Sequence, residues 1–444
     1  MRASNMLWAL GEPARAKKLI DEASRIRSPE VRRYIDAFLA VYWFAVDQPD
    51  TAMKASKDFA LADLPVVGAE IAWARTAILA DAGQVTEAVA TAEAGYAVAT
   101  RSFDAPQMRF NIADAHVSAL LLSGQVNEAL DVAERVRHEA ADMPGAAQLL
   151  GAAVAGRAAL GAGRLHSACA LLDHAAVGLS ATHVMGWGYR YHIARATALA
   201  LRGSTDEAAA ALATLSELHR PFRSLDYELT LARAWVAAGQ GAVSEAIMLA
   251  LSAAERASAK GRFAAEVMCL QAATQFGDHS SALRLSKLES IVEGPRVGVA
   301  ARFAAALRDS HGAELALISE EFERIGDGVA AVDAAARAAL VHRRNDLRGS
   351  ALGCAARAEF LAQQYGAINT PTLRQASEPL PLTDREVEIV MLIGEGLTNR
   401  EVAQRLTLSV RTVESHIYRA MLKTGTTSRE ELAALLRRPN ARAD

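Results

Sequence analysis

A small pattern recurs through the first 340 residues and constrains the fold more than any other feature. A turn residue, usually Gly, is followed five positions later by Ala. Successive turns lie 36, 36, 41, 39, 40, 38, 36 and 49 residues apart, and a period of this length accommodates a helix, a tight turn and a second helix. The pairs are Gly11/Ala16, Asp47/Ala52, Gly83/Ala88, Gly124/Ala129, Gly163/Ala168, Gly203/Ala208, Gly241/Ala246, Gly277/Ala282 and Gly326/Ala331.

Each part of the pattern has a physical reason. Gly permits the left-handed backbone that ends a helix, and Ala lets the next helix approach its partner closely. Acidic residues such as Glu87, Glu128 and Glu245 precede the Ala and suit a helix N-terminus. The pattern resembles the tetratricopeptide (TPR) repeat, although the strict 34-residue period with its Trp, Tyr and Pro anchors is absent. We therefore expect a TPR-like solenoid of paired helices over residues 1–364.

Composition indicates an all-α chain of two or three domains. The protein has 444 residues, of which 51% are hydrophobic but only 5% aromatic, so that Ala supplies much of the apolar content, and only 12 are Pro. The net charge of −3 excludes a generally basic nucleic-acid coat, so any nucleic-acid contact must be local.

The cysteines and apolar runs indicate a cytoplasmic protein. Cys169, Cys269 and Cys354 are far apart and have no metal-ligand spacing, which predicts free thiols in a reducing compartment. The apolar run 6–10 is too short for a signal peptide or a membrane span, and charges interrupt the later Ala-rich stretches.

The repeat pattern has a break at each end. Only about ten residues precede Gly11, fewer than a capped first helix needs, so we expect another domain or chain to complete that end. Residues 365–381 contain three prolines and no apolar period, which predicts a semi-extended linker.

The last part of the chain, residues 382–438, predicts a small domain of four helices. Three S/T-x-x-E capping boxes occur there, Ser409 can cap the third helix, and Gly396 and Gly425 can end helices. The boxes pair Thr383 with Glu386, Thr398 with Glu401, and Ser428 with Glu431.

Two of these helices, from Thr398 to Ile417, have the form of a helix-turn-helix, whose second helix enters the DNA major groove. In that helix the helical spacing directs four apolar residues to the core: Val410, Val413, Ile417 and Ala420. The same spacing turns a mixed polar set outward: Arg411, Glu414, Ser415, Tyr418 and Arg419.

Residues 382–423 resemble the LuxR-type helix-turn-helix family through L-T-D-R-E-V-E-I, G-L-T-N-R-E-V-A and L-S-V-R-T-V-E-S-H-I, and K-T-G-T-T-S-R-E-E-L continues the match. The resemblance implies that the second and third helices read double-stranded DNA. It also implies that the fourth helix, about 429–436, supports a homodimer on two half-sites.

The same resemblance assigns roles by motif position. Glu414, Ser415 and Tyr418 correspond to base-reading positions. Many family members carry Lys where this chain has Glu414, so Glu414 is either an acceptor from a cytosine amino group or a solvated residue. The corresponding phosphate contacts are Thr398, Asn399, Arg400, Arg411, Thr412, His416, Arg419 and Lys423.

The charge of residues 382–438 is nearly balanced, with nine Lys/Arg against eight Asp/Glu. We therefore expect weak, salt-sensitive binding by one copy and higher affinity from dimerisation. The alternative is a helical domain that only docks on the repeats.

Helical repeats followed by this domain resemble the C-terminal half of the large ATP-binding LuxR regulators, the MalT-like group. The ATPase is not part of the resemblance, because G-x-x-x-x-G-K-[ST] does not occur in the chain, and ATP binding is not expected.

Two other clusters have open interpretations. The aromatic segment 183–192, with Arg190 and Tyr191, either packs between repeats or lines a ligand groove. The segment 219–227, which includes Asp226 and Tyr227, is expected to be a loop between repeats with a solvated set of charges.

The sequence predicts a cytoplasmic, sequence-specific DNA-binding regulator whose repeats sense a protein or small molecule. The alternative is a scaffold whose last domain is vestigial or serves dimerisation. H-E-x-x-H, G-x-S-x-G and Cys/His pairings are absent from the sequence, so neither enzymatic activity nor a metal or other cofactor is expected.

Overall fold

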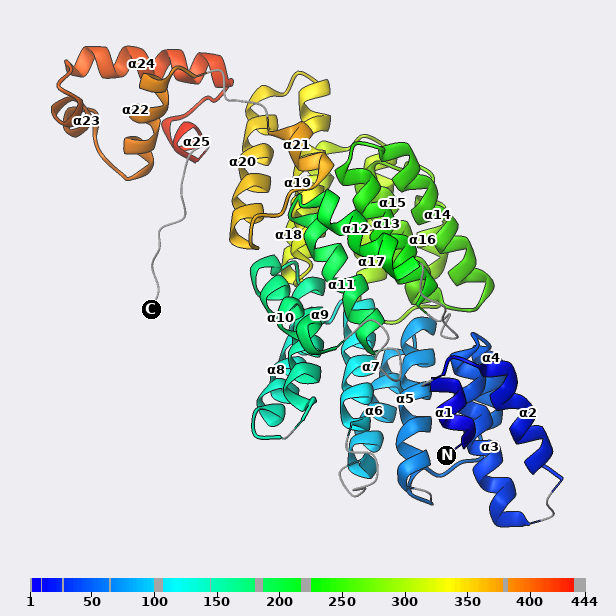
Figure 1. The fold of residues 1–444 in the computed structure, drawn as a ribbon. Helices are drawn as coiled ribbons and strands as arrows, with labels where there is room; N and C mark the ends of the chain where they lie inside the picture. Colours follow the sequence, from blue (N-terminus) through cyan, green and yellow to red (C-terminus); the bar gives the residue numbers. More distant parts are fainter. Residues whose placement is uncertain are drawn as a thin grey trace.

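The computed structural model describes residues 2–8, 10–25, 28–63, 65–99, 107–143, 145–179, 187–216, 225–377 and 382–434, and its regular elements there are all helical. Figure 1 shows a stack of helices, the helical array, followed by a small C-terminal module of four helices, α22–α25. The first half of the array contains α1 Arg2–Trp8, α2 Pro13–Ala23, α3 Pro29–Ala45, α4 Pro49–Ser56, the 3-10 helix η1 Leu61–Asp63, α5 Pro65–Ala82, α6 Val85–Ala99, α7 Met108–Ser123, α8 Val126–Ala141, α9 Ala147–Gly161 and α10 Leu165–Gly178.

The second half of the array continues from α11 to α21. Its helices are α11 Trp187–Leu201, α12 Thr205–Ser216, α13 Asp226–Gly239, α14 Val243–Ala259, α15 Phe263–Phe276, α16 Ala282–Leu288, α17 Pro295–Arg308, α18 Gly312–Arg324, α19 Gly328–Arg344, α20 Arg348–Gln364 and α21 Pro371–Ala376.

The predicted Gly/Ala pattern is confirmed at every position. All nine turn residues have a positive φ, between 63° and 110°, and the nine alanines are at most 4% exposed. In a typical turn the amide of Gln84 donates to the carbonyl of Leu79, which is the bond expected where a left-handed residue ends a helix. The pattern therefore marks real helix–turn–helix units.

Two further turns of this kind, both without glycine, were missed. Ser310 and Asp346 have φ values of 53° and 56°, and buried residues, Leu315 and Ala351, follow five positions later. Asp and Ser are short and polar enough to occupy turns at modest cost. Of these turns without Gly, the sequence pattern included only the one at Asp47.

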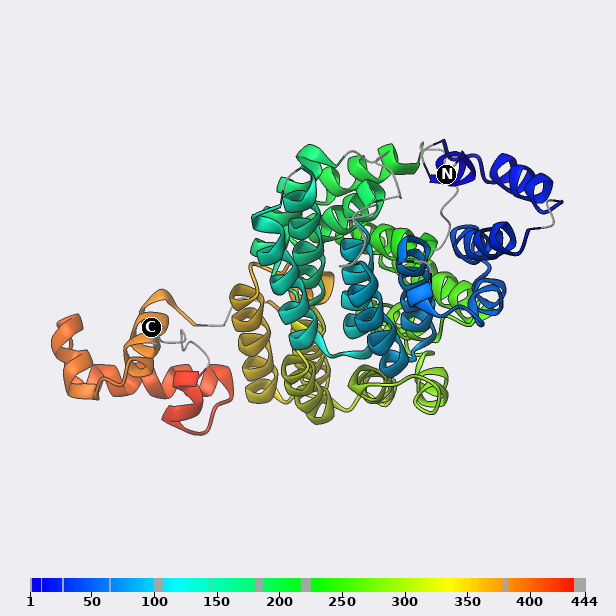
Figure 2. The ribbon, with the colours of Figure 1, turned by 90° about the horizontal axis from the view of Figure 1, so that it is seen from below.

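The array folds back so that its early turns pack against its later helices. Figures 1 and 2 show α5 and α7 near the later helices α15 and α17, with which they are in contact. Asp47 forms an ion pair with Arg262, 215 residues further along the chain. Hydrogen bonds join the two halves from Glu293 N to Gly83 O (2.9 Å), Arg296 Nε to Leu121 O (3.0 Å) and Leu165 N to Tyr365 O (2.8 Å). Within the second half, Asn369 N donates to Leu201 O (2.7 Å) across 168 residues of sequence.

This closure gives Gly124 a second role besides its positive φ of 91°. A Cβ atom on Gly124 would lie 2.8 Å from the backbone nitrogen of Arg296, closer than a carbon atom can approach. Gly241 has nearly the same φ, 92°, but a Cβ there would meet nothing within 4 Å. A substitution at Gly241 would therefore change stability only through the positive φ. The same substitution at Gly124 would also disturb the contact between the early turn and Arg296.

The stretch expected to be a semi-extended linker is instead largely packed on the array. Thr370 caps α21, and Thr370, Leu373 and Ala376 are buried. The Thr370 hydroxyl donates to the buried carboxylate of Asp333 in α19, which also accepts from Gln275 Nε2 at 3.0 Å. No local pattern indicates this packing, because Thr370 and Thr372 bond to residues 37 and 97 positions upstream.

The segment 219–227 also differs from its prediction where the structure describes it. His219 and Arg220 lie outside the described residues, but Asp226 and Tyr227 begin α13 and do not form a loop between repeats, and Tyr227 is buried in the core. Its hydroxyl donates to Asp81 at 3.2 Å.

We expect Gly124→Ala to destabilise the protein more than Gly241→Ala. Both substitutions place a side chain in the left-handed region, at a cost of about 1–2 kcal/mol. Gly124→Ala should add about 1–3 kcal/mol, because the new methyl group forces α7 and α17 apart. Urea unfolding of the two variants measures the difference, and equal losses would contradict the closure of the array at this turn.

Asp333→Asn should reduce the dependence of stability on pH. Burial raises the pKa of the Asp333 carboxyl to about 7, against the opposing hydrogen bond from Thr370. Between its ordinary pKa and 7 the folded protein holds a proton that the unfolded chain releases, so stability falls as pH rises. Thermal unfolding from pH 4 to 8 should show a smaller fall for Asp333→Asn than for wild type. The exposed control Asp131→Asn should behave as wild type.

Candidate nucleic-acid interface

The C-terminal module consists of α22 Asp384–Gly394, α23 Asn399–Leu406, α24 Val410–Thr424 and α25 Arg429–Ala434. Its helix starts follow the predicted caps. The boxes at Thr383/Glu386 and Thr398/Glu401 are both complete, and the Ser409 hydroxyl accepts from the amide of Thr412. Gly396 and Gly425 have the predicted positive φ values of 91° and 69°.

The third capping box differs from its prediction by one residue. The Ser428 hydroxyl accepts from the amide of Glu431 as expected, at 3.1 Å. The Glu431 carboxylate, however, accepts from the amide and hydroxyl of Thr427, not from the amide of Ser428.

A small apolar core fixes the angle between the helices. Ile389 and Val390 of α22, Val402 of α23, Val413 of α24 and Leu432 of α25 are fully buried in it. The predicted core residues Ile417 and Ala420 are buried as well, but Val410 is 39% exposed. Val410 is the first residue of α24 and so lies beyond the reach of the core.

The turn between α23 and α24 is tight. Thr407 ends α23 with a left-handed φ of 54°, and Ser409 already caps α24. Short polar side chains suit both positions, because one must tolerate a positive φ and the other must accept a backbone N–H. The turn holds α24 across α23 with one long face uncovered.

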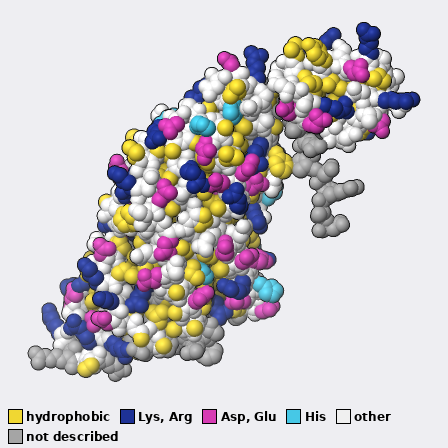
Figure 3. Space-filling view, turned by 180° about the vertical axis from the view of Figure 1, so that it is seen from behind, with side chains coloured by type: hydrophobic (Ala, Val, Ile, Leu, Met, Phe, Trp, Pro, Cys, Tyr) yellow, Lys and Arg dark blue, Asp and Glu magenta, His cyan; other side chains and the backbone are white. Residues whose placement is uncertain are grey.

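The predicted outward residues of α24 lie on this face. Arg411, Glu414, Ser415, Tyr418 and Arg419 are all exposed, and Tyr418 is 68% exposed despite its size. Arg411, Ser415 and Tyr418 follow one another at helical spacing, so they present a row of side chains of the kind that reaches base edges and phosphates. In the space-filling view the module is a separate lobe with Lys and Arg at its outer edge (Figure 3).

The remaining predicted phosphate contacts differ in whether their side chains already have hydrogen-bond partners within the module. Arg400 is exposed at the start of α23. The Thr398 hydroxyl donates to its capping partner Glu401, and the Asn399 side-chain oxygen accepts from Arg429. Thr412 shares a hydrogen bond with Ser409, so its hydroxyl is engaged within the module. His416 is half-buried, and its Nδ1 has no partner among the described residues.

Lys423 has a structural partner that sequence reasoning missed. Its Nζ lies 2.7 Å from a carboxylate oxygen of the buried Glu386, joining the end of α24 to the start of α22. Burial by itself would raise the pKa of Glu386, but hydrogen bonds from Lys423 and Thr383 outweigh it and lower that pKa below its ordinary value. The two residues are 37 positions apart, so no local pattern connects them.

The array touches the module near the end of α24. Leu352 of α20 packs against the module core, and a Cβ on Gly349 would lie 3.0 Å from the carbonyl oxygen of Gly425. The contact therefore uses the C-terminal end of α24 and leaves the row from Arg411 to Tyr418 exposed.

Neither a membrane helix nor a metal cluster is found in the part of the chain that the structure describes. No helix there has the length and apolar character needed to cross a bilayer. No three His, Cys, Asp or Glu side chains there group in a way that would hold a metal ion.

Lys423→Met should destabilise the module by about 1–3 kcal/mol, because it leaves the buried Glu386 carboxylate without its cation. The lowered pKa means that the pair stabilises the fold above the ordinary Glu pKa and loses this effect as pH falls. Hydrogen exchange of α22 and α24 amides in the full-length protein measures both effects. Arg405→Met, which removes an exposed cation, is the control; equal exchange in the two variants would contradict a structural role for Lys423.

Comparison with known proteins agrees with this geometry. Residues 380–436 match the family described as "Bacterial regulatory proteins, luxR family". The chain is 40% identical over 74 residues to "Response regulator Rre1" of Synechocystis sp., a match that covers 17% of this chain and 30% of that protein. It is 37% identical over 73 residues to "Oxygen regulatory protein NreC" of Staphylococcus aureus strain bovine RF122 / ET3-1, covering 16% of this chain and 34% of that protein. The chain thus spans about a third of the length of these relatives, and its residues 380–436 are a helix-turn-helix domain of the luxR family.

Proposed function

We propose that the protein is a transcription regulator that binds double-stranded DNA sequence-specifically through α24. The observation that carries the proposal is the exposed row Arg411, Ser415 and Tyr418 on the second helix of a luxR-family helix-turn-helix. An α-helix fits the major groove, where each base pair presents a distinct pattern of donors and acceptors. The names of the matched relatives, a response regulator and an oxygen regulatory protein, are consistent with a regulatory role.

Within this proposal, the exposed residues divide into two groups. Glu414, Ser415 and Tyr418 read bases, and Arg400, Arg411 and Arg419 contact phosphates. Lys423 is a weaker candidate for a phosphate contact than the sequence indicated, because Glu386 already holds its ammonium group. Thr398, Asn399 and Thr412 contribute mainly by fixing the start of each reading helix, and His416, in the middle of α24, is kept as a phosphate contact.

The affinity of one module is expected to be low. Its charges nearly balance, and DNA affinity depends on the number of phosphates neutralised. We therefore propose that two copies bind two half-sites, with α25 supporting the dimer. In this proposal the helical array senses an effector and changes how the two modules are presented.

Arg411→Ala and Tyr418→Ala should affect DNA binding in different ways. Arg411→Ala should weaken binding on all sequences. It should also reduce the slope of log binding constant against log salt concentration by about 1, the value for one phosphate contact. Tyr418→Ala should reduce the preference for one base near its position, by about 1–3 kcal/mol in binding free energy between the preferred base and the others. Selection of random duplexes on the full-length protein at two salt concentrations measures both.

The control is Arg405→Ala, which removes an equal charge from an exposed position of α23 that pairs with Glu395. It should change neither the motif nor its salt dependence to the same extent. Equal loss on all sequences for Tyr418→Ala would remove its base-reading role. If wild type binds no duplex at either salt concentration, the proposed function is wrong and the scaffold interpretation is favoured.

A further inference from the structure

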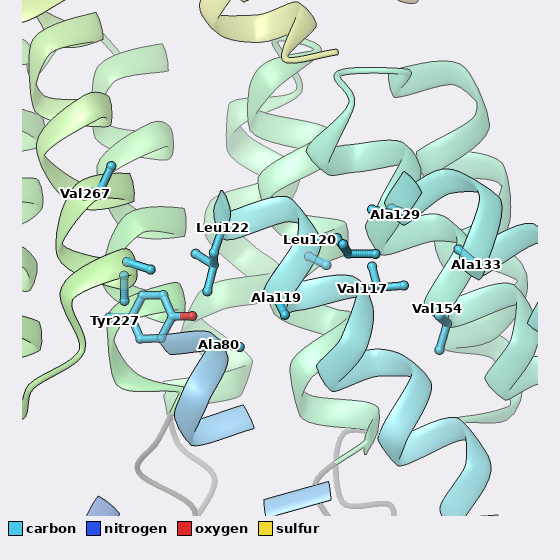
Figure 4. Close-up of a cluster of buried hydrophobic side chains, with 14 of the residues drawn as sticks. Ala80, Val117, Ala119, Leu120, Leu122, Ala129, Ala133, Val154, Tyr227 and Val267 are labelled. Atoms are coloured by element: carbon cyan, nitrogen blue, oxygen red, sulfur yellow. The ribbon is translucent and has the colours of Figure 1, made fainter. Parts of the chain in front are cut away.

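The closed array contains a cavity of about 210 Å³ that is partly open to solvent. Its lining comes from α7, α9, α11, α13, α15, α17 and the start of α19, so it lies where the early helices meet the later ones. Figure 4 shows two of its lining residues, Leu122 of α7 and Tyr227 of α13, close together in the buried cluster between these helices. The cavity is thus a product of the closure and does not belong to any single helix pair.

Most of the cavity wall is apolar. Protein interiors are normally packed without voids of this size, because the atoms that line a void lose dispersion contacts. Small side chains, Ala194 and Ala272, line part of the wall and leave the space unfilled. The larger apolar lining residues are Leu121, Leu122, Leu160, Leu231, Trp235 and Met268.

The charged groups in the wall already have partners of opposite charge. Arg296 pairs with Asp327, and both line the cavity. Arg157 pairs with Asp114, and Glu228 accepts from Arg190 at 2.7 Å. A charged ligand would lose its hydration and find no unpaired charge in return.

Polar groups for a neutral ligand are nevertheless present. Ser118, Thr197 and Tyr227 contribute hydroxyls, and Gln271 and Gln275 contribute amides, all of them already hydrogen-bonded within the protein. Thr197 and Tyr227 donate to Ile193 O and Asp81, which leaves their oxygen lone pairs to accept from a ligand. The aromatic rings of Trp235 and Tyr227 offer flat surfaces on which a ring can stack. A wall of this kind, mostly apolar with a few polar groups, is typical of small-molecule sites.

We propose that this cavity binds a small, uncharged, largely apolar molecule that carries an aromatic ring and one or two hydrogen-bonding groups. That this molecule is the effector rests on the proposed function. The proposal that the molecule binds here depends only on the shape and chemistry of the cavity.

A continuous set of contacts leads from the cavity to the module. Asp327 caps α19, and Val329 lies in its first turn; both line the cavity. Helix α19 packs along α20, and α20 carries Gly349 and Leu352, which touch the module at Gly425 and at its core. Filling the cavity therefore acts on the helix pair that holds the module.

A matched pair of fluorescent probes tests the proposal on the full-length protein. N-phenyl-1-naphthylamine is uncharged, and 8-anilinonaphthalene-1-sulfonate has the same rings with an added negative charge. We expect the neutral probe to bind saturably at one site per chain and at least tenfold more tightly than the anionic probe. Trp235→Phe should reduce the energy transfer from tryptophan to the bound probe.

Ala272→Phe places a ring in the cavity and should abolish the saturable site. Ala313→Phe, at an exposed position of α18, is the control and should leave binding unchanged. If Ala272→Phe fails to fold, Thr197→Leu offers a smaller filling change and should weaken the probe at least fivefold.

Three results would overturn the proposal: no saturable binding by wild type, equal binding of the two probes, or unchanged binding in both cavity variants. A cavity that is simply filled with water would give the first of these. The failure of the proposed function is measured separately, because it is the absence of DNA selection. Saturable probe binding without DNA selection would leave the site in place and remove only its role as an effector site.

Discussion

The packing of early turns against later helices is the constraint on which the rest of the structure depends. In a simple repeat array each helix pair contacts only its neighbours, so the array can be lengthened without bringing distant repeats together. Here the turns at Gly83 and Gly124 instead meet Glu293 and Arg296, about 200 residues further along the chain. The array therefore has an interior as well as two faces. That interior contains both the cavity and the ionic cluster around Asp114.

The ionic cluster shows how the closure stays specific. Asp114 of α7 accepts from Arg157 of α9 and from Arg190 and Tyr191 of α11, and Arg190 also donates to Glu228 of α13. Charges buried at this depth stabilise a fold only when their partners are correctly placed, so they penalise any other stacking of the helices. The aromatic segment 183–192 thus packs between helix pairs where it is described. Arg190 connects it to both Asp114 and Glu228. An Ala-rich chain, whose apolar surfaces are much alike, needs such groups to select one arrangement.

The sequence predicted what depends on neighbouring residues and missed what depends on distant ones. The nine Gly/Ala pairs, the caps at Thr383, Thr398 and Ser409, and the outward face of α24 are local patterns, and the structure agrees with them. The closure of the array, the burial of Tyr227 and the packing of Thr370 on Asp333 involve partners from 37 to 215 residues away. No period or motif carries such information. Lys423 shows the limit most clearly, because its motif position indicates a phosphate contact while its distant partner is Glu386.

The place where the array meets the module limits how regulation can work. Because α20 touches the module at Gly425 and through Leu352, the array leaves Arg411 to Tyr418 open in this arrangement. Simple masking of the DNA-reading face is therefore not the mechanism that this contact favours. A contact at the end of α24 can instead set the orientation of the whole module. In the proposed dimer, two modules would have to match the spacing of two half-sites along the DNA helix, so a small rotation at Gly425 would decide whether both can bind at once.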